Sequence, residues 1–261
     1  MKKFKLGIGL LVGAMLLVTG CGGEKKDDKP AEAPQKVIKV GTNPDFAPFE
    51  FMDKDGKMTG FDIELMQLVG KQMDVKIDFQ SMAFDGLVPA LQAGNLDMAI
   101  AGMTITEERK KSIAFSDSYY KSGLAIMVKK ENTSINSEAD LKGKKVAVQI
   151  GTTGSMAAHQ IEGAIVTDYN ATPDVFLELK NDGADAAIND LPVIQTFLNS
   201  EEGKDFKMVA ELLDNADYFG IAINPAKKEL AEEVNKALAE LKENGEYEKL
   251  YVKWFGTQPN F

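Results

Sequence analysis

The chain has 261 residues, with 40 acidic against 30 basic side chains and a net charge of −10. It contains one cysteine (Cys21), one histidine (His159) and one arginine (Arg109) beside 29 lysines. One cysteine excludes intrachain disulfides and cysteine-cluster metal sites, one histidine leaves little room for histidine catalysis, and the acidic balance speaks against nucleic acid as a partner.

Residues 1–20 are predicted to be a secretory signal peptide. Three lysines stand among the first five residues, and the apolar run over 6–18 is shorter than the ~20 residues that span a bilayer. The sequence Val18-Thr19-Gly20-Cys21 resembles a bacterial lipobox, which implies that Cys21 is lipidated and becomes the mature N-terminus. An ordinary signal peptide with a chance cysteine is the alternative.

Residues 21–35 are predicted to be a flexible, lipid-anchored linker. This segment consists mainly of Gly, Lys, Glu, Asp, Ala and Pro and has no apolar periodicity. Two or three acyl chains on Cys21 suffice for stable anchoring. We therefore expect the folded part to be extracytoplasmic, at the outer face of the cytoplasmic membrane or in the periplasm, and to be held at the membrane by the lipid alone.

The first part of the remaining chain alternates strands and helices. Apolar alternation predicts strands, helical spacing predicts helices, and glycine marks a helix end. The predicted elements are strand 37–41, helix 60–73, strand 75–79, helix 84–93 and strand 98–101. This alternation predicts a parallel sheet.

A second alternation follows, with a strand-like segment at 124–128 before it. Its predicted elements are strand 145–150, helix 153–160, helix 173–181, strand 184–188, helix 191–198, strand 218–223 and a helix from Pro225 to Gly245. An aromatic tail at 247–255 is predicted to pack in the core, with ligand stacking as the alternative.

The two alternations predict an α/β fold with two lobes joined by two crossovers. We expect residues 36–124 and 221–261 to form lobe 1 and residues 125–220 to form lobe 2. Ligands of open α/β sheets bind beyond the carboxyl ends of the strands. The predicted ligand site is therefore the cleft between the lobes.

Arg109 is the first candidate site residue. A cation is supplied by lysine everywhere else in the chain. Arginine differs in offering a planar, permanently charged fork that holds a carboxylate with two hydrogen bonds. A clamp for a ligand carboxylate is the favoured interpretation, and a structural ion pair is the alternative.

Two turns carry further candidates. A strand ends at Ala101-Gly102, where backbone groups become free, and the Thr104 hydroxyl is expected to face the cleft beside Arg109. The turn Gly151-Thr152-Thr153-Gly154 begins a helix. Helix N-termini attract anions, so this turn could hold a phosphate or a carboxylate.

Asp190 closes a predicted strand and could accept an ammonium group from a ligand. Its local alternative, which the pattern taken alone favours, is to cap the helix that begins at Leu191. The sequence Asp53-Lys54-Asp55-Gly56 has the look of a calcium loop, but Met58 occupies the position that requires glycine. We predict a hairpin turn there and no metal site.

A carboxylate clamp and an ammonium acceptor across one cleft suit a free amino acid. Three stretches, at 60–65, 101–110 and 115–120, resemble signature segments of the solute-binding proteins of polar amino-acid ABC importers (family 3). The resemblance covers essentially all of residues 36–256. It implies a two-lobed periplasmic-binding-protein (Venus-flytrap) fold of type II with two hinge strands.

The resemblance also implies roles for individual residues. Arg109 would hold the ligand α-carboxylate with the Thr104 hydroxyl and the Thr153 N–H, and Asp190 would hold the α-ammonium with the Gly102 carbonyl. Two aromatic walls would sandwich the ligand. The complete set of expected ligand-binding residues is Asn43, Phe46, Phe84, Ala101, Gly102, Thr104, Arg109, Gln149, Thr152, Thr153, Asn189 and Asp190.

The resemblance is greatest to glutamine binders. Asn43, Gln149 and Asn189 carry neutral amides where those binders carry charged or ionisable side chains, and amides suit a ligand amide. We therefore expect a polar neutral amino acid, glutamine first. The alternative is a basic amino acid, for which Asp45 or Glu50 could supply the carboxylate that is missing at Asn43.

The expected partners are the free amino acid and an ABC permease with its ATPase. We expect a monomer that binds no nucleic acid and needs no cofactor or metal. We expect a binding protein and no enzyme, because no acid–base pair emerges. A dehydratase on the same fold is the alternative from another class.

Overall fold

The computed structural model describes residues 35–211 and 217–259. The predicted signal peptide, nearly all of the predicted linker and Cys21 lie outside these residues. Within the described part, no helix has both the length and the apolar character needed to cross a bilayer.

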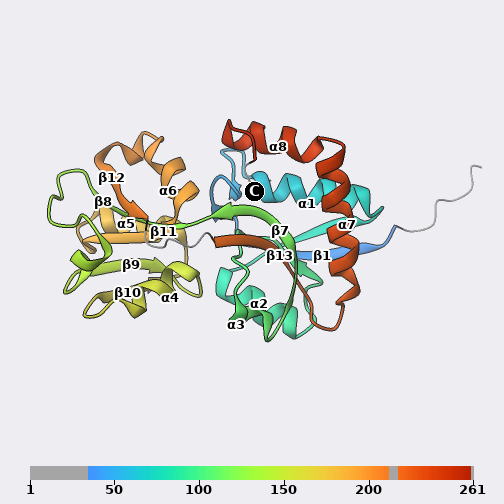
Figure 1. The fold of residues 1–261 in the computed structure, drawn as a ribbon, viewed down its shortest axis with the longest axis horizontal. Helices are drawn as coiled ribbons and strands as arrows, with labels where there is room; N and C mark the ends of the chain where they lie inside the picture. Colours follow the sequence, from blue (N-terminus) through green and yellow to red (C-terminus); the bar gives the residue numbers. More distant parts are fainter. Residues whose placement is uncertain (1–34, 212–216, 260–261) are drawn as a thin grey trace, which may run out of the picture. The chain divides into compact units, whose positions relative to one another are not determined.

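Lobe 1 is built on a five-stranded sheet in the order β5-β1-β6-β13-β7 (Figure 1). β1 runs parallel to β5 and β6, and β13 runs antiparallel to β6 and β7. The strands are β1 (Val37–Thr42), β5 (Lys76–Ser81), β6 (Met98–Ala99), β7 (Ala114–Ser122) and β13 (Asp217–Ile223).

Helices cover both faces of this sheet (Figure 1), and apolar residues of its central strands, such as Val40, Met98 and Ile221, are fully buried. One face carries α1 (Phe61–Gln72), α7 (Glu229–Glu243) and α8 (Glu246–Phe255), and the other carries α2 (Phe84–Gln92) and the short α3 (Glu107–Lys110). A small hairpin sheet of β2 (Asp45–Phe46), β3 (Glu50–Met52) and β4 (Met58–Thr59) contacts α1.

Lobe 2 repeats this plan with the strand order β10-β9-β11-β8-β12. The strands are β8 (Leu124–Lys129), β9 (Lys145–Gln149), β10 (Ile165–Tyr169), β11 (Ala186–Asp190) and β12 (Phe206–Glu211). The helices are α4 (Thr153–Gln160), α5 (Thr172–Lys180) and α6 (Leu191–Leu198), with single 3-10 turns at Glu138–Leu141 and Glu202–Asp205.

The predicted α/β alternation is confirmed in both lobes, with two differences. The sequence pattern gives no strand for β7, β10 or β12, each of which lies at an edge of its sheet, and no helix for α8. The chain passes between the sheets at Gly123 and again between β12 and β13. The predicted lobe boundaries at 124 and 221 fall inside β8 and β13.

The aromatic tail packs in the core, as predicted. Phe61 of α1 lies 5.1 Å from Phe255 and 6.1 Å from Tyr247 between ring centroids, and Tyr120 of β7 lies 4.8 Å from Phe255. The predicted apolar stripe of α7, at Leu230, Val234, Leu238 and Leu241, is buried. This cluster fixes the positions of α1 and β7 in lobe 1.

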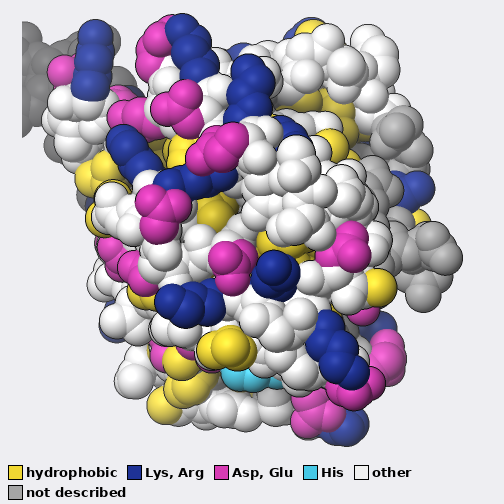
Figure 2. All heavy atoms as spheres, turned by 90° about the vertical axis from the view of Figure 1, so that its left-hand side faces the viewer, with side chains coloured by type: hydrophobic (Ala, Val, Ile, Leu, Met, Phe, Trp, Pro, Cys, Tyr) yellow, Lys and Arg dark blue, Asp and Glu magenta, His cyan; other side chains and the backbone are white. Residues whose placement is uncertain are grey.

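Two features that stand out in the sequence, the turn at Asp53 and the single histidine, make only local contacts in the structure. Asp53 accepts hydrogen bonds from the backbone N–H groups of Asp55 and Lys57, which stabilises the β3–β4 hairpin turn as predicted. His159 is an exposed residue of α4 and lies 2.8 Å from the Asp168 carboxylate. Figure 2 shows lysines and acidic side chains interspersed over the outer face of lobe 2, a mixture that gives no field of a single sign on that face.

Candidate functional site

The predicted site residues meet at the carboxyl ends of strands from both lobes. β1 and β6 of lobe 1 lead into Asn43 and the turn at Ala101-Gly102, and β9 and β11 of lobe 2 end at Gln149 and Asp190. The strand ends therefore face each other across the contact between the lobes, which is where open α/β sheets bind ligands.

A small cavity lies at this meeting point. Eleven of the twelve predicted residues line it, together with Glu50. The exception is Asn189, which is buried and donates through Nδ2 to the Thr172 hydroxyl at 3.5 Å. The free space is about 10 Å³, room for about one water molecule. Anything larger than a water molecule therefore enters only when the lobes or the lining side chains move apart.

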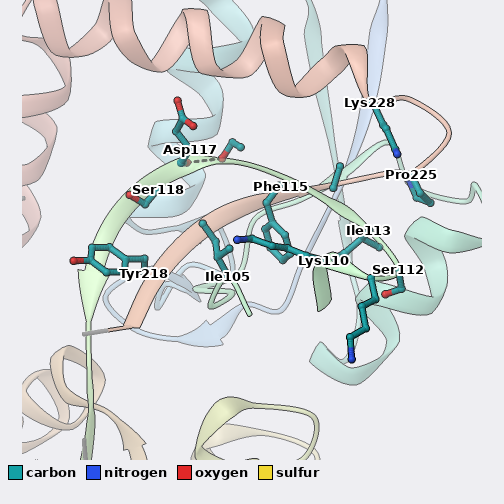
Figure 3. Close-up of a pocket in the computed structure, with 13 residues that line it drawn as sticks. Ile105, Lys110, Ser112, Ile113, Phe115, Asp117, Ser118, Tyr218, Pro225 and Lys228 are labelled. Carbon is teal, nitrogen blue, oxygen red and sulfur yellow. Dashed lines mark hydrogen bonds between the residues drawn. The ribbon is translucent and has the colours of Figure 1, made fainter. Parts of the chain in front are cut away.

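A larger groove of about 810 Å³ lies elsewhere, on lobe 1 (Figure 3). Figure 3 shows it lined by β7, β13 and the start of α7, with Lys110, Phe115 and Tyr218 among the side chains. Neither Arg109 nor any other predicted site residue lines it. The smaller cavity is the candidate site, because the strand ends and the buried charged groups converge there.

Arg109 is held at the cavity by a short, capped helix. The Thr106 hydroxyl accepts a hydrogen bond from the Arg109 backbone N–H and caps α3, as predicted. The side chain is 7% exposed, and its guanidinium lies 5.4 Å from the centre of the Phe84 ring. Burial lowers the pKa of Arg109 to about 10, so it remains charged at neutral pH.

The guanidinium hydrogen-bonds carbonyls of both lobes. Nη1 donates to the Thr104 carbonyl at 2.6 Å in lobe 1, and Nη2 donates to the Gly151 carbonyl at 2.9 Å in lobe 2. Gln149 makes a second contact between the lobes by donating from Nε2 to Asn43 Oδ1 at 2.9 Å. The structure is therefore a closed arrangement in which lobe 1 and lobe 2 are hydrogen-bonded to each other.

Asp190 lies fully buried on the lobe 2 side. Its Oδ1 accepts a hydrogen bond from the Ser122 hydroxyl at 2.9 Å, and it makes no side-chain cap for α6. The alternative in which the Asp190 side chain caps α6 is therefore wrong, because this side chain turns toward Ser122 at the end of β7. Burial and the charge of Asp217 raise the pKa of Asp190 to about 7, against the effect of Arg109.

The three predicted amides are engaged with protein groups. Gln149 Nε2 bonds to Asn43, and Gln149 Oε1 accepts from the Thr172 hydroxyl at 2.8 Å. Thr172 Oγ1 in turn accepts from Asn189. The amides thus form a chain that supports the contact between the lobes, so their donors and acceptors are largely used before any ligand arrives.

Glu50 is the cavity residue that the predicted site set omits. It is 0% exposed, and no N–H or hydroxyl group among the described residues donates to either of its carboxyl oxygens. Asp45, which was named with it as a substitute carboxylate, is partly buried near the cavity, and burial raises its pKa to about 6. A signal for Glu50 existed in the sequence, because this acid stands between two phenylalanines, Phe49 and Phe51, in the segment that forms β3.

Gly102 gives the cavity wall its shape. Its φ of +51° lies in the left-handed region, and a Cβ there would stand 2.6 Å from the Phe46 ring. Its N–H donates to Asp62 Oδ2 at 2.8 Å. Only glycine allows the phenylalanine to cover this turn so closely.

The fold and site define a two-lobed α/β binding protein whose cavity lies between the lobes. Residues 38–257 match the bacterial extracellular solute-binding proteins, family 3, and the chain belongs to this family. The sequence predicted a solute-binding protein and not an enzyme, and the family assignment agrees with that prediction.

Named relatives and solved structures agree with this assignment. The arginine-binding extracellular protein ArtP of Bacillus subtilis is 36% identical and covers 98% of each chain. A probable histidine-binding protein of Neisseria gonorrhoeae is 34% identical, over 95% of this chain and 94% of that one.

Two solved structures of an ancestral arginine-binding protein, one bound to arginine and one to glutamine, are 44% identical. Their TM-scores are 0.82 and 0.80, and each match covers 85% of this chain and 99% of the other. The predicted two-lobed periplasmic-binding-protein fold is thereby confirmed.

Proposed function

We propose that the chain binds a basic amino acid, arginine first, in the cavity between its lobes and delivers it to the permease of an ABC importer. Relatives over nearly the whole chain are named as arginine-binding and histidine-binding proteins, and one is named as an ABC transporter arginine-binding protein. These names favour the basic alternative over glutamine, which the three amides had suggested.

The observation that carries this proposal is the buried Glu50 carboxyl group. It lines the cavity, is fully enclosed and has no hydrogen-bond donor among the described residues. A guanidinium offers five N–H donors in a planar fork that matches a carboxylate. A ligand amide offers two donors and no charge, so it compensates a buried carboxyl group less well.

The two ends of the amino-acid backbone find complementary groups in the same cavity. Arg109 is proposed to hold the α-carboxylate by exchanging its bond to the Gly151 carbonyl for one to the ligand. Asp190 is proposed to hold the α-ammonium. Phe46 and Phe84, both buried in the cavity wall, are proposed to sandwich the ligand.

The amides no longer favour glutamine, because they bond to one another and to Thr172. Their proposed role is to hold the lobes together around the ligand. Glutamine nevertheless belongs in the test, since a 44% identical ancestral arginine-binding protein was solved bound to glutamine.

Isothermal titration calorimetry of the purified chain with arginine, lysine, histidine, glutamine and citrulline tests the proposal. Citrulline has nearly the shape of arginine but no charge, so arginine should bind at least tenfold tighter, about 1.4 kcal/mol. The Glu50→Gln variant should lose most of this preference. Glu64→Gln is the matched control, because Glu64 lies on α1 and pairs with Lys253 at the surface. Tight glutamine binding with no response to arginine would refute the proposal.

The location of the protein is part of the proposal. The family is extracellular by its description, and we propose that acyl chains on Cys21 hold the mature chain on the outer face of the membrane. Residues 1–20 would be removed as the signal peptide. The lipobox-like sequence before Cys21 supports this proposal.

A further inference from the structure

Two buried carboxyl groups interact at the cavity: Glu50 lines it, and Asp62 acts on Glu50 by charge and by a side-chain hydrogen bond. Glu50 on β3 and Asp62 in the first turn of α1 are both 0% exposed. Asp62 Oδ2 accepts hydrogen bonds from the Gly102 N–H at 2.8 Å and from the Tyr119 hydroxyl at 2.7 Å. Asp62 is therefore linked directly to the turn that forms one wall of the cavity.

The other three oxygens of this pair have no donor. Among the described residues, no N–H or hydroxyl group donates to Glu50 Oε1, Glu50 Oε2 or Asp62 Oδ1. A hydrogen bond between the two carboxyl groups is therefore formed only when one of them carries a proton. Two adjacent buried carboxylates without such a proton would repel each other in a medium of low dielectric constant.

The surroundings of Glu50 add further negative charge. The groups that act on it are Asp62 from α1, Asp45 from β2 and Asp190 from β11, and the Tyr119 hydroxyl of β7 interacts with the pair. Arg109 lines the same cavity, but its Nη1 and Nη2 donate to the Thr104 and Gly151 carbonyls.

The proton resides mainly on Glu50. Burial, with the neighbouring Asp62, Asp45 and Asp190, raises the pKa of Glu50 well above its usual range. Burial raises the pKa of Asp62 to about 6, while the Gly102 and Tyr119 donors stabilise its charged form. At neutral pH the pair thus holds one proton, as coupled carboxyl groups do.

We propose that Asp62 and Glu50 share one proton in the closed chain and release it to solvent when a cationic ligand side chain binds. The Glu50 O–H bond breaks, the proton passes to the buffer, and the ligand's N–H groups donate to the resulting carboxylate. Asp62 is then a positioning residue for specificity. It accepts the Glu50 hydrogen bond while no cation is bound, and it holds Gly102 in place. This inference rests on the proposed binding of a basic amino acid.

The ligand pair arginine and citrulline isolates this proton. Both ligands have the same α-ammonium and α-carboxylate groups, so any protons exchanged by Asp190 are equal for the two. The difference in proton release is then due to the ligand side chain. We expect about one more proton to be released per arginine than per citrulline at pH 7.

Calorimetry in buffers of different ionisation enthalpy, such as phosphate and Tris, counts these protons with the full purified chain. Arginine affinity should also rise with pH between 5 and 7, by up to tenfold per unit relative to citrulline. Equal proton counts for the two ligands, with arginine bound tightly, would overturn this inference alone. Failure of arginine to bind would overturn the proposed function and this inference with it.

The Asp62→Asn variant distinguishes a positioning role of Asp62 from a purely structural one. Asparagine Oδ1 can still accept from Gly102 and Tyr119, and its Nδ2 can donate to a charged Glu50. We expect the difference in protons to fall close to zero while arginine still binds. Glu64→Gln on the same helix should leave the difference unchanged. A loss of affinity for both ligands alike, with the proton difference intact, would make Asp62 a structural residue only. If Asp62→Asn does not fold, the pH dependence of the unmodified chain decides the question.

Discussion

Replacing Arg109 by lysine tests the centre of the site. The two guanidinium nitrogens reach carbonyl groups in different lobes, Thr104 at 2.6 Å and Gly151 at 2.9 Å. Lysine keeps the positive charge but has a single nitrogen at its tip, so it cannot reproduce the planar fork. The variant should therefore lose at least one charged hydrogen bond in the closed, ligand-bound chain.

The expected loss of affinity follows from the strength of that hydrogen bond. A hydrogen bond to a charged group contributes about 1.5–3 kcal/mol, which corresponds to roughly a 10- to 150-fold increase in Kd. The same loss should be found for arginine and for glutamine, because the proposed contact is to the α-carboxylate that both ligands have. Calorimetry with both ligands measures it.

The matched control is Lys111→Arg, at the exposed end of the same helix. It should change neither affinity nor melting temperature by a measurable amount. If Arg109→Lys lowers the melting temperature but leaves both affinities unchanged, Arg109 acts as a structural link and our assignment of a ligand clamp is refuted.

Three further predictions concern the cavity wall, the buried acids and the anchor. Gly102→Ala should lower affinity at least tenfold and destabilise the chain by about 1–3 kcal/mol, because the added Cβ would stand 2.6 Å from Phe46. Titration measures the affinity, and thermal unfolding measures the stability. The control is Gly86→Ala, where an added Cβ meets nothing within 4 Å. The pKa values of Asp62 and Asp190 are raised to about 6 and about 7 in the folded chain, above the ~3.9 of an unfolded aspartate. The folded chain therefore binds more protons between about pH 4 and 7, and this stabilisation is lost as the pH rises through 6 to 7. The melting temperature without ligand should be higher at pH 5 than at pH 8, and the opposite order would contradict the assignment. Cys21→Ala should release the protein from membranes into the aqueous phase of a detergent partition; continued membrane association would argue against the lipid anchor.

Much of the fold could be predicted because its signals are local. The stripe of α7 and the strand–helix alternation are visible in apolar spacing alone, and the Thr106 cap of α3 needs only four neighbouring residues. The edge strands β7, β10 and β12 could not be predicted, because partly exposed edge strands have weak apolar patterns. The place of β12 also depends on pairing with β8, far earlier in the sequence.

The candidate site likewise contains residues that could be predicted from the sequence and residues that could not. Arg109 could be predicted because scarcity in the composition marks it, and the turn at Gly102 because a buried strand ends there. The roles of Asn43 and Gln149 could not, since their amides bond to each other across 106 positions of the chain. The sequence indicates Glu50 only as one of two acids that could supply the carboxylate missing at Asn43. Its burial depends on α1 and the hairpin packing together, which no short stretch of sequence encodes.

The hydrogen bonds between the lobes, from Arg109 to Gly151 and from Gln149 to Asn43, also govern the rate at which a ligand arrives. A closed cavity with room for about one water admits nothing larger, so entry waits for these bonds to break. The observed association rate should then level off at high ligand concentration, at the opening rate of the protein itself. That limiting rate belongs to the chain and should be the same for every amino acid that it binds.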